Sequence, residues 1–357
     1  MITPMVSVVM SVLNGERFLP EAVESILEQS FRDFEFIVIN DGSTDGSGSM
    51  LDSYRRSDPR VRVYHQENRG LIESLNRGSG LAQGKYIARM DADDIAIRDR
   101  LMWQVDFMEQ HPEVGVVGGA IEVINTKGKA VAIERNPTKD REIKLALLRG
   151  YCPLVHPTVL MRKEALVSVE GYRKVVVHAE DYDLWLRIAD QYQLANLEAV
   201  VLKYRRHSCQ VSVRRYRQQA LSSLAARAAA LSRRNGKPDP LDSVGEITPA
   251  LLTGLGVSEA TQQSTLGRSY VTCLRSMCDA GEYPEALTVI DTLRRSDWKH
   301  FGSPVIADFH VAAARLYWRQ RRFARSILSA GHALITRPIM LGRPLKPLLR
   351  RLRLVQT

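Results

Sequence analysis

Short β-branched runs alternate with stretches of helical spacing over the first 120 residues, and this alternation constrains the fold more than any other feature. The runs span residues 6–12, 34–40, 61–66, 85–90 and 114–120. Continuous apolar runs of this length are typical of strands buried on both faces. Strand–helix alternation with short connections predicts an α/β fold with a parallel, doubly wound sheet. Ligands of such sheets bind outside the carboxyl ends of the strands.

Gly and Pro mark the ends of several predicted helices. The spacing predicts a helix over 71–84 closed by Gly84 and a helix over 98–112 stopped by Pro112. Beyond residue 120, we expect four further elements. They are a hairpin at 124–133, a strand and short helix at 156–166, a helix at 179–191 and a strand at 197–207.

The chain is too long for one ordinary core of about 100–200 residues, so we expect more than one domain. A Pro/Gly/Asp-rich break follows residue 233, and helical patterning without strands follows residue 250. Tyr283 and Phe323 each open the second helix of a hairpin and stand 40 residues apart, against about 34 for a tetratricopeptide unit. The predicted parts are a catalytic domain (1–235), a linker (236–249), an all-α helical-hairpin domain that is repeat-like (250–336) and a basic tail (337–357).

The net charge of +10 is concentrated in two segments without acidic residues, 203–237 and 337–353. Such segments suit an anionic membrane face, a nucleotide or a nucleic acid, unless they are only solvated helix faces. Apart from Tyr204 and Tyr216, they lack aromatic residues for base stacking, which disfavours nucleic acid.

Cysteine usage and hydropathy favour a cytoplasmic setting. The four cysteines form no CxxC pair and have no zinc-site spacing. No apolar run approaches the roughly 20 residues of a membrane span. The apolar N-terminus lacks a basic region, so we expect a first strand there and no signal peptide.

The unusual polar residues fall in the loops after three predicted strands, at 11–16, 40–47 and 91–94. Carboxylates clustered at a strand end cap a helix, pair with arginine or hold a hard cation. In "DADD" (91–94), Asp94 is a candidate cap, and Arg98 and Arg100 are candidate partners.

A second acidic loop on the same edge favours the cation. Asp41 and Asp45 belong to "NDGSTDGS", whose glycines permit close backbone approach. Mg²⁺ or Mn²⁺ shares its coordination between carboxylates and phosphate oxygens, so a diphosphate would complement such an edge. The alternative is that this loop is only a turn and helix cap.

Several segments in this order resemble the inverting nucleotide-sugar glycosyltransferases of the GT-A type, family 2. They are "VSVVMSVLNGERFLPEAVESILEQSFRDFEFIVINDGSTDGS", "NRG", "LNRGSGLAQGKYIARMDADDI", "HPTVLMRKEAL" and "AEDYDLWLRIA". The resemblance covers about residues 4–210 and does not extend over the C-terminal 120 or so. It implies a GT-A-like, mostly parallel sheet and a role in cell-envelope polysaccharide biosynthesis.

For the nucleotide, the resemblance implies that Asp41 contacts the base and that Asp91, the first acid of the DxD motif, faces the ribose. Ser11 and Leu13 would line the base pocket, where family members often carry an aromatic in place of Leu13. His156 would line the acceptor side as a fold residue.

For the metal and the chemistry, the resemblance implies Asp93 as the main metal ligand, with Asp94 in or near its coordination shell. His207 resembles a histidine that approaches the metal or diphosphate in some members, or is a surface histidine beside basic residues. Glu180 and Asp181 match the family's ED motif, with Asp181 as the catalytic base.

The implied function is inverting, metal-dependent sugar transfer from a nucleotide-sugar, UDP- or dTDP-linked. The acceptor would be a hydroxyl of a polysaccharide or lipid-linked oligosaccharide. The two basic segments would hold the enzyme at the inner face of the plasma membrane. Alternatives are a sugar-phosphate nucleotidyltransferase, disfavoured because no Gly-rich, basic phosphate loop follows the first strand, and a non-catalytic nucleotide-binding scaffold. No P-loop motif occurs.

Overall fold

The computed structural model describes residues 3–207, 215–281, 283–295 and 301–337, which form two compact units. The first contains residues 1–205 and 222–247, and the second contains residues 206–221 and 248–357. The domain limits drawn from the sequence stay predictions, and all of the predicted basic tail except Arg337 lies outside the described residues. No helix of the described segments has the length and apolar character needed to cross a bilayer.

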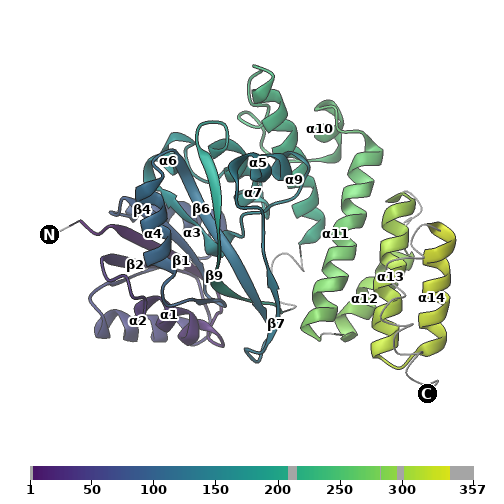
Figure 1. Ribbon diagram of the computed structural model, residues 1–357, viewed down its shortest axis with the longest axis horizontal. Helices are drawn as coiled ribbons and strands as arrows, with labels where there is room; N and C mark the ends of the chain where they lie inside the picture. The colour runs from purple at the N-terminus through teal and green to yellow at the C-terminus, as the bar shows by residue number, and fades with distance from the viewer. Residues whose placement is uncertain (1–2, 208–214, 282, 296–300, 338–357) are drawn as a thin grey trace. The chain divides into compact units, whose positions relative to one another are not determined.

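The first unit is a mixed α/β structure around one sheet (Figure 1). Its strands are β1 (Val6–Val12), β2 (Phe34–Asp41), β3 (Val61–Gln66), β4 (Tyr86–Asp91), β5 (Ile95–Ala96), β6 (Val114–Ile124), β7 (Ala130–Glu134), β8 (Leu160–Arg162) and β9 (Gln193–Arg205). Its helices are α1 (Leu19–Leu27), α2 (Ser47–Ser57), α3 (Leu71–Leu81), α4 (Arg100–Gln110), α5 (Asp140–Leu148), the 3₁₀ turn η1 (His156–Thr158), α6 (Lys163–Ser168) and α7 (Glu180–Ile188).

The strand order is β3-β2-β1-β4-β8-β6-β9-β5, with β7 paired to β6. Pairs β1–β2, β1–β4, β2–β3 and β6–β9 are parallel, whereas β8, β5 and β7 pair antiparallel with their neighbours. The half β3-β2-β1-β4 is parallel throughout, which confirms the predicted α/β fold with a parallel sheet in this part of the unit. The order reverses direction at β1, where the chain moves from β3 to β4, so a ligand site is expected there.

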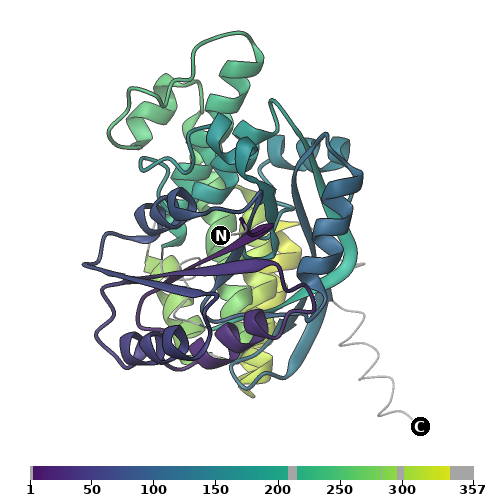
Figure 2. The same ribbon diagram turned by 90° about the vertical axis from the view of Figure 1, so that its left-hand side faces the viewer.

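Helices cover both faces of the sheet (Figures 1 and 2). On one face, Met10 of β1 and Val38 of β2 belong to a core that includes apolar residues of α1, α2 and α4. On the other face, Gly78 of α3 lies so close to Val9 that an added Cβ would approach Val9 Cγ1 to 2.6 Å. The first strands are buried on both faces, which explains their continuous apolar runs.

Gly84 has a different role from the helix stop that the sequence predicted. Helix α3 ends at Leu81, and Gly84 donates its N–H to Ser7 Oγ at 2.8 Å. An added Cβ would lie 2.6 Å from the backbone nitrogen of Ser7. The glycine is therefore required because the chain passes against β1 at this point.

The segment 203–237 contains helix α9 (Tyr216–Arg234), in line with the alternative that it is a helix, although the sequence analysis assigned that helix no bounds and no buried side. In the first unit, α9 buries small and apolar residues such as Leu224 and Ala229. Arg233 pairs with Asp190 and Asp239 at 2.8 and 2.5 Å. Part of this positive charge is thus neutralised internally.

The second unit is helical, as predicted. Its remaining helices are α10 (Pro249–Gly254), α11 (Glu259–Ala280), α12 (Tyr283–Arg295), α13 (Ser303–Arg319) and α14 (Phe323–Thr336). Gly281 takes the left-handed conformation after α11, and Arg321 does so after α13. Leu274, Ile290 and Leu316 lie in one core shared by α11, α12 and α13.

Candidate active site

The carboxyl ends of β1, β2 and β4 lie at one edge of the sheet. Ser11 is in register with Asp91 of β4, and Val12 is in register with Asn40 of β2. Asp41 and Asp91 therefore end the two strands that flank β1. With about 4.8 Å between neighbouring strands, their backbones are separated by about 10 Å.

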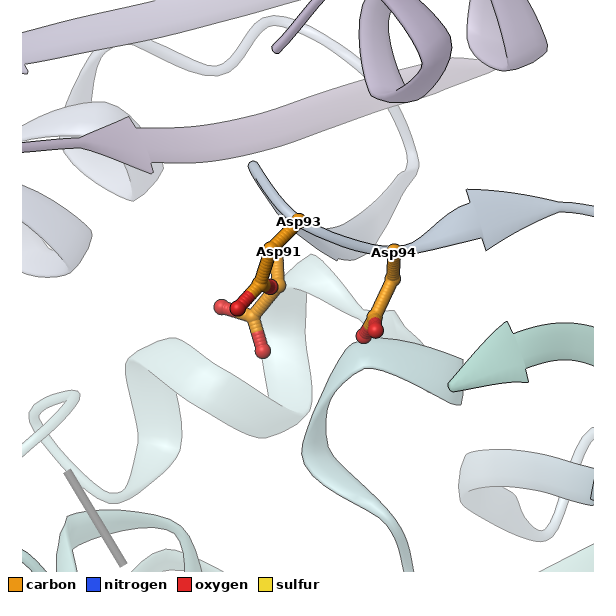
Figure 3. A group of neighbouring side chains, drawn as sticks. All are labelled: Asp91, Asp93 and Asp94. Atoms are coloured by element: carbon orange, nitrogen blue, oxygen red, sulfur yellow. The ribbon is translucent and has the colours of Figure 1, made fainter. Parts of the chain in front are cut away.

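Three carboxylates gather in the loop after β4 (Figure 3). One oxygen each of Asp91, Asp93 and Asp94 lies within 4.8 Å of the other two. Their side chains point to the same side of the loop, with those of Asp91 and Asp93 close together. Asp91 and Asp93 are partly exposed, whereas Asp94 is fully buried.

The environment of Asp94 is suited to a cation. Its Oδ1 accepts the backbone N–H of Arg205 at 2.8 Å, and its buried Oδ2 has no hydrogen-bond donor within the described part of the chain. Burial raises the pKa of Asp94 well above its ordinary value, and the charges of Asp93 and Asp91 raise it further. Oxygen donors crowded in this way are those that Mg²⁺ and Mn²⁺ prefer, so the residues present fit a hard divalent ion.

Arg205 fixes this acidic loop and was missed in the sequence, where it counted as part of a basic surface. It ends β9 and is 1% exposed. Its Nε donates to the carbonyl of Asp93 at 2.8 Å, its Nη2 pairs with Glu21 of α1, and its guanidinium lies 4.4 Å from the Phe18 ring centroid. The predicted partner Arg100 instead donates to the carbonyls of Arg89 and Val159.

Arg89 is a second buried cation that the sequence analysis did not single out. It lies on β4 and forms an ion pair with Asp91. Its charge also lowers the pKa of Glu180 and of Asp181, which places it within electrostatic reach of both acidic groups. A lone arginine inside the apolar run 86–90 was the available signal, because a buried charge requires a partner.

Glu180 and Asp181 open helix α7, where the helix dipole favours negative charge. Burial, followed by repulsion from Asp181, raises the pKa of Glu180 to about 7. Burial also raises the pKa of Asp181, whose Oδ1 accepts the N–H of Tyr182 at 2.7 Å. Asp91 raises the pKa of both. A carboxyl group with the pKa of Glu180 can exchange protons near neutral pH.

The position of α7 is set by buried polar contacts. Arg187 donates to Asp183 Oδ2 and to the carbonyl of Gly171, both at 2.8 Å. His156 Nε2 and the Tyr172 hydroxyl share a hydrogen bond of 2.8 Å, and the His156 ring lies edge-on to Trp185. Burial, and then the charge of Arg89, lowers the pKa of His156 well below its ordinary value. A neutral, buried histidine fits the fold role expected of His156.

Asp41 is 2% exposed and organises the loop after β3. Its Oδ1 accepts Gln66 Nε2 at 2.7 Å and Arg69 N–H at 2.8 Å, and its Oδ2 accepts Gly70 N–H at 2.9 Å. The next residue, Gly42, has a φ of +78° and lies against the backbone of Asn68. The base contact predicted for Asp41 would use the acceptor capacity that these bonds leave.

Asp45 ties two loops together. Its Oδ2 accepts the N–H of Glu16 at 3.1 Å, while the Glu16 carboxylate accepts the N–H of Gly46 at 2.8 Å. Nearby, Asn14 N–H donates to Ser43 Oγ at 3.0 Å. These bonds match the alternative that "NDGSTDGS" is a turn. Among the described residues, the cluster of carboxylates consists of Asp91, Asp93 and Asp94 and does not include Asp45.

The remaining predicted residues lie as follows. Ser11 is partly buried on β1, and Leu13, just beyond it, is 48% exposed. His207 follows β9 by two residues and belongs to the second unit. Their roles in binding stay predictions.

A family model and curated relatives of this sequence indicate the same protein family. The model of glycosyl transferase family 2 matches residues 7–169. The O-antigen biosynthesis glycosyltransferase WbnJ of Escherichia coli is 33% identical over 211 residues, which cover 58% of this chain and 82% of WbnJ.

Two solved structures share the fold. TarS of S. aureus (residues 1–349), in complex with UDP, aligns with a TM-score of 0.53 at 16% identity and covers 95% of this chain and 92% of its own. The mannosyltransferase PcManGT of Pyrobaculum calidifontis, in complex with GDP-Man and Mn²⁺, aligns with a TM-score of 0.50 at 18% identity. The alignment covers 94% of this chain and 87% of the PcManGT chain.

Proposed function

Because this chain belongs to glycosyl transferase family 2 and is a glycosyltransferase, we propose that it transfers a sugar from a UDP- or dTDP-linked donor, with inversion, to a hydroxyl of a polysaccharide or lipid-linked oligosaccharide. The name of WbnJ, which refers to O-antigen biosynthesis, supports the acceptor class. The UDP and GDP-Man in the complexes of TarS and PcManGT support a nucleotide-sugar donor.

One observation carries the proposal. The acids that follow β4 and the acids that open α7 come from distant parts of the chain, yet Asp91 and Arg89 act electrostatically on both Glu180 and Asp181. This coupling supports a diphosphate site next to a proton acceptor. Sugar transfer from a nucleotide diphosphate requires both groups next to the anomeric carbon.

We assign the donor to the edge formed by β1, β2 and β4. Asp41, Ser11 and Leu13 would contact the nucleoside, and Asp91 would face the ribose. Asp93 and Asp94 would hold the divalent ion, and the approach of His207 to that ion stays a prediction from the family resemblance. When bound, that ion supplies positive charge to the departing diphosphate.

Asp181 takes the proton of the acceptor hydroxyl in this proposal. Burial, and after it the charge of Asp91, raises the pKa of Asp181, which makes this carboxylate a stronger base than an ordinary aspartate. A single in-line displacement at the anomeric carbon inverts its configuration. His156 would line the acceptor side as a buried fold residue.

We further propose that the protein acts in the cytoplasm and contacts the anionic inner face of the plasma membrane. This location would bring the active site to a lipid-linked acceptor. Its support is the acid-free, basic sequence at the C-terminus.

A panel of nucleotide-sugars with Mn²⁺ or Mg²⁺ tests the proposal, together with two isosteric variants. Asp93→Asn should weaken metal-dependent donor binding. Asp181→Asn should retain binding and lower turnover by about 10²–10⁴-fold. Asp106→Asn, an exposed acid on α4, is the matched control and should change neither.

The proposal fails if no donor in the panel is transferred or hydrolysed and no UDP or dTDP binds. Equal loss of binding in Asp93→Asn and Asp181→Asn would contradict the division of roles. Pyrophosphate release from a nucleoside triphosphate and a sugar phosphate would indicate the nucleotidyltransferase alternative instead.

A further inference from the structure

The last described helix, α14, has its apolar residues on the side away from its neighbour. Its buried residues are small: Ser326, Ser329 and Ala333. Ser326 Oγ donates to the carbonyl of Ala314 on α13 at 2.8 Å, which identifies the inward side. An ordinary surface helix buries its large apolar residues and exposes its polar ones.

Four large apolar side chains of α14 are exposed. Phe323 is 48% exposed, Leu328 is 64% exposed, Ile327 is 67% exposed and Ile335 is 80% exposed. At about 100° per residue, these four positions fall within an arc of about 140°, opposite the three buried ones. Concentrated exposed apolar surface of this kind marks an interaction site. We call these four residues the α14 outer face.

All charged residues that the structure describes within α14 and at its two ends are positive. Arg321, Arg322 and Arg325 are exposed at the start of the helix, and Arg337 is exposed at its end. From residue 309 to residue 357, the sequence contains eleven Arg and Lys and no Asp or Glu. An apolar helix face flanked by arginines, without acids, is typical of helices that lie in the interface of an anionic bilayer.

Two other occupants are less compatible with this charge. A second copy of the chain would bring two acid-free, cationic segments together, and their repulsion would oppose association. A peptide partner would need a surface that is both acidic and apolar. A bilayer that contains anionic lipid already combines these two properties. The other basic segment is a weaker candidate, because its Arg205 is buried and its Arg233 is paired with acids.

We propose that the α14 outer face inserts between the headgroups of an anionic membrane and that the arginines at both ends of α14 bind the lipid phosphates. This inference deepens the membrane contact proposed above by assigning it to named residues. It does not require any particular transfer chemistry. Because the aliphatic residues are exposed, their replacement is expected to leave the fold intact.

Co-sedimentation of the full chain with vesicles tests the proposal. The vesicles contain phosphatidylcholine alone or with about one third phosphatidylglycerol. The double variant Ile327→Gln/Leu328→Gln should lower partitioning onto the anionic vesicles by at least about tenfold, because two aliphatic side chains lose their burial in the bilayer. Val167→Gln on α6, where Val167 is 66% exposed, is the matched control and should partition like the wild type.

The charged residues are tested separately. Arg321→Gln/Arg322→Gln/Arg325→Gln should reduce binding to anionic vesicles, and raising NaCl from about 0.1 to about 0.5 M should weaken wild-type binding. Equal binding of the wild type and the Ile327/Leu328 variant would overturn the proposal, as would salt-independent binding or none. A dimer of the wild type that the double variant loses would show that a second copy is the occupant.

Donor hydrolysis without vesicles separates this inference from the proposed function. The double variant should retain wild-type hydrolysis. If no donor reacts with any variant but vesicle binding still depends on α14, then the transfer chemistry is wrong and the membrane contact stands.

Discussion

Two acidic loops lie at the same edge of the sheet and use their carboxylates in opposite ways. In the loop after β2, Asp41 accepts hydrogen bonds from Gln66, Arg69 and Gly70, and Asp45 accepts one from Glu16. In the loop after β4, three carboxylates approach one another, and the pKa of the buried Asp94 rises.

The difference teaches that the number of acids at a strand end does not by itself indicate a metal site. What distinguishes the loops is how fully hydrogen-bond donors satisfy each carboxylate, since Asp94 Oδ2 accepts none among the described residues. Backbone N–H groups of neighbouring turns satisfy Asp41 and Asp45, so these acids act as structural connectors. The loop at 91–94 instead concentrates negative charge that a divalent ion would balance.

The largest expected effect separates the loops by activity. Asp93→Asn should lower turnover by about 10²–10³-fold, because the charge that holds the ion at the leaving group is lost. Asp45→Asn should keep turnover within a fewfold of the wild type. Initial rates at saturating donor measure both, and an equal loss in both variants would erase the distinction.

Stability should change in opposite directions in the two loops. Asp41→Ala leaves a buried side-chain amide and two backbone N–H groups without their acceptor and should cost about 2–4 kcal/mol. Asp94→Asn keeps the bond to Arg205 N–H but removes a repelled, buried charge, so the metal-free protein should gain about 1 kcal/mol at pH 7. Urea unfolding without metal measures both changes. Destabilisation by Asp94→Asn would mean that its carboxylate is structural too.

A third test concerns the charges that face the loop at 91–94. Burial raises the pKa of Asp181, the proposed base, and the pKa of Glu180 beside it is raised to about 7, so turnover should rise with pH above the range in which an ordinary aspartate titrates. Glu180→Gln removes the charge beside Asp181 and should move this rise to lower pH.

The same shift has a consequence for folding. An acid whose pKa is higher in the folded state binds more protons there, so the free energy of unfolding should fall as the pH rises from about 4.5 to about 7. Glu180→Gln should reduce that slope. An unchanged pH–rate profile and an unchanged slope would contradict the assigned environment of Glu180.

The smallest effect is expected where the loop after β2 meets the loop after β1. Ser43→Ala removes the acceptor of Asn14 N–H in an exposed contact and should cost about 0.5 kcal/mol. Donor affinity should stay within about twofold. A large loss of donor affinity would show that this contact shapes the nucleotide site more than its bond strength suggests.

Much of the fold was predictable because its strands are buried and continuous. The run 61–66 matches β3 at both ends, and the run 6–12 matches β1. Gly84 was misassigned because a glycine after a helix has the same local signature whether it caps the helix or allows the chain to pass Ser7. The buried side of helix α9 was missed because its alanines lie among arginines that suggested a solvent-exposed surface.

Within the candidate site, the acids were predictable and the cations that hold them were not. The acids lie in the local patterns "DADD" and "AEDYD", which can be read directly from the sequence. The parallel pairing of β1 with β4 places "DADD" at the carboxyl edge of the sheet. Arg205 contacts Glu21, 184 positions earlier, and no local pattern specifies such a pair. Three bonds from the end of β3 and the loop after it determine the structural role of Asp41, which its own sequence context does not specify.

Calorimetric titration of UDP and dTDP, with and without Mn²⁺, tests the central claim most directly. The account predicts that Mn²⁺ strengthens nucleotide binding in the wild type and in Asp45→Asn, and that this strengthening disappears in Asp93→Asn. Metal-dependent binding that survives Asp93→Asn but disappears in Asp45→Asn would place the ion at the other acidic loop and contradict the account.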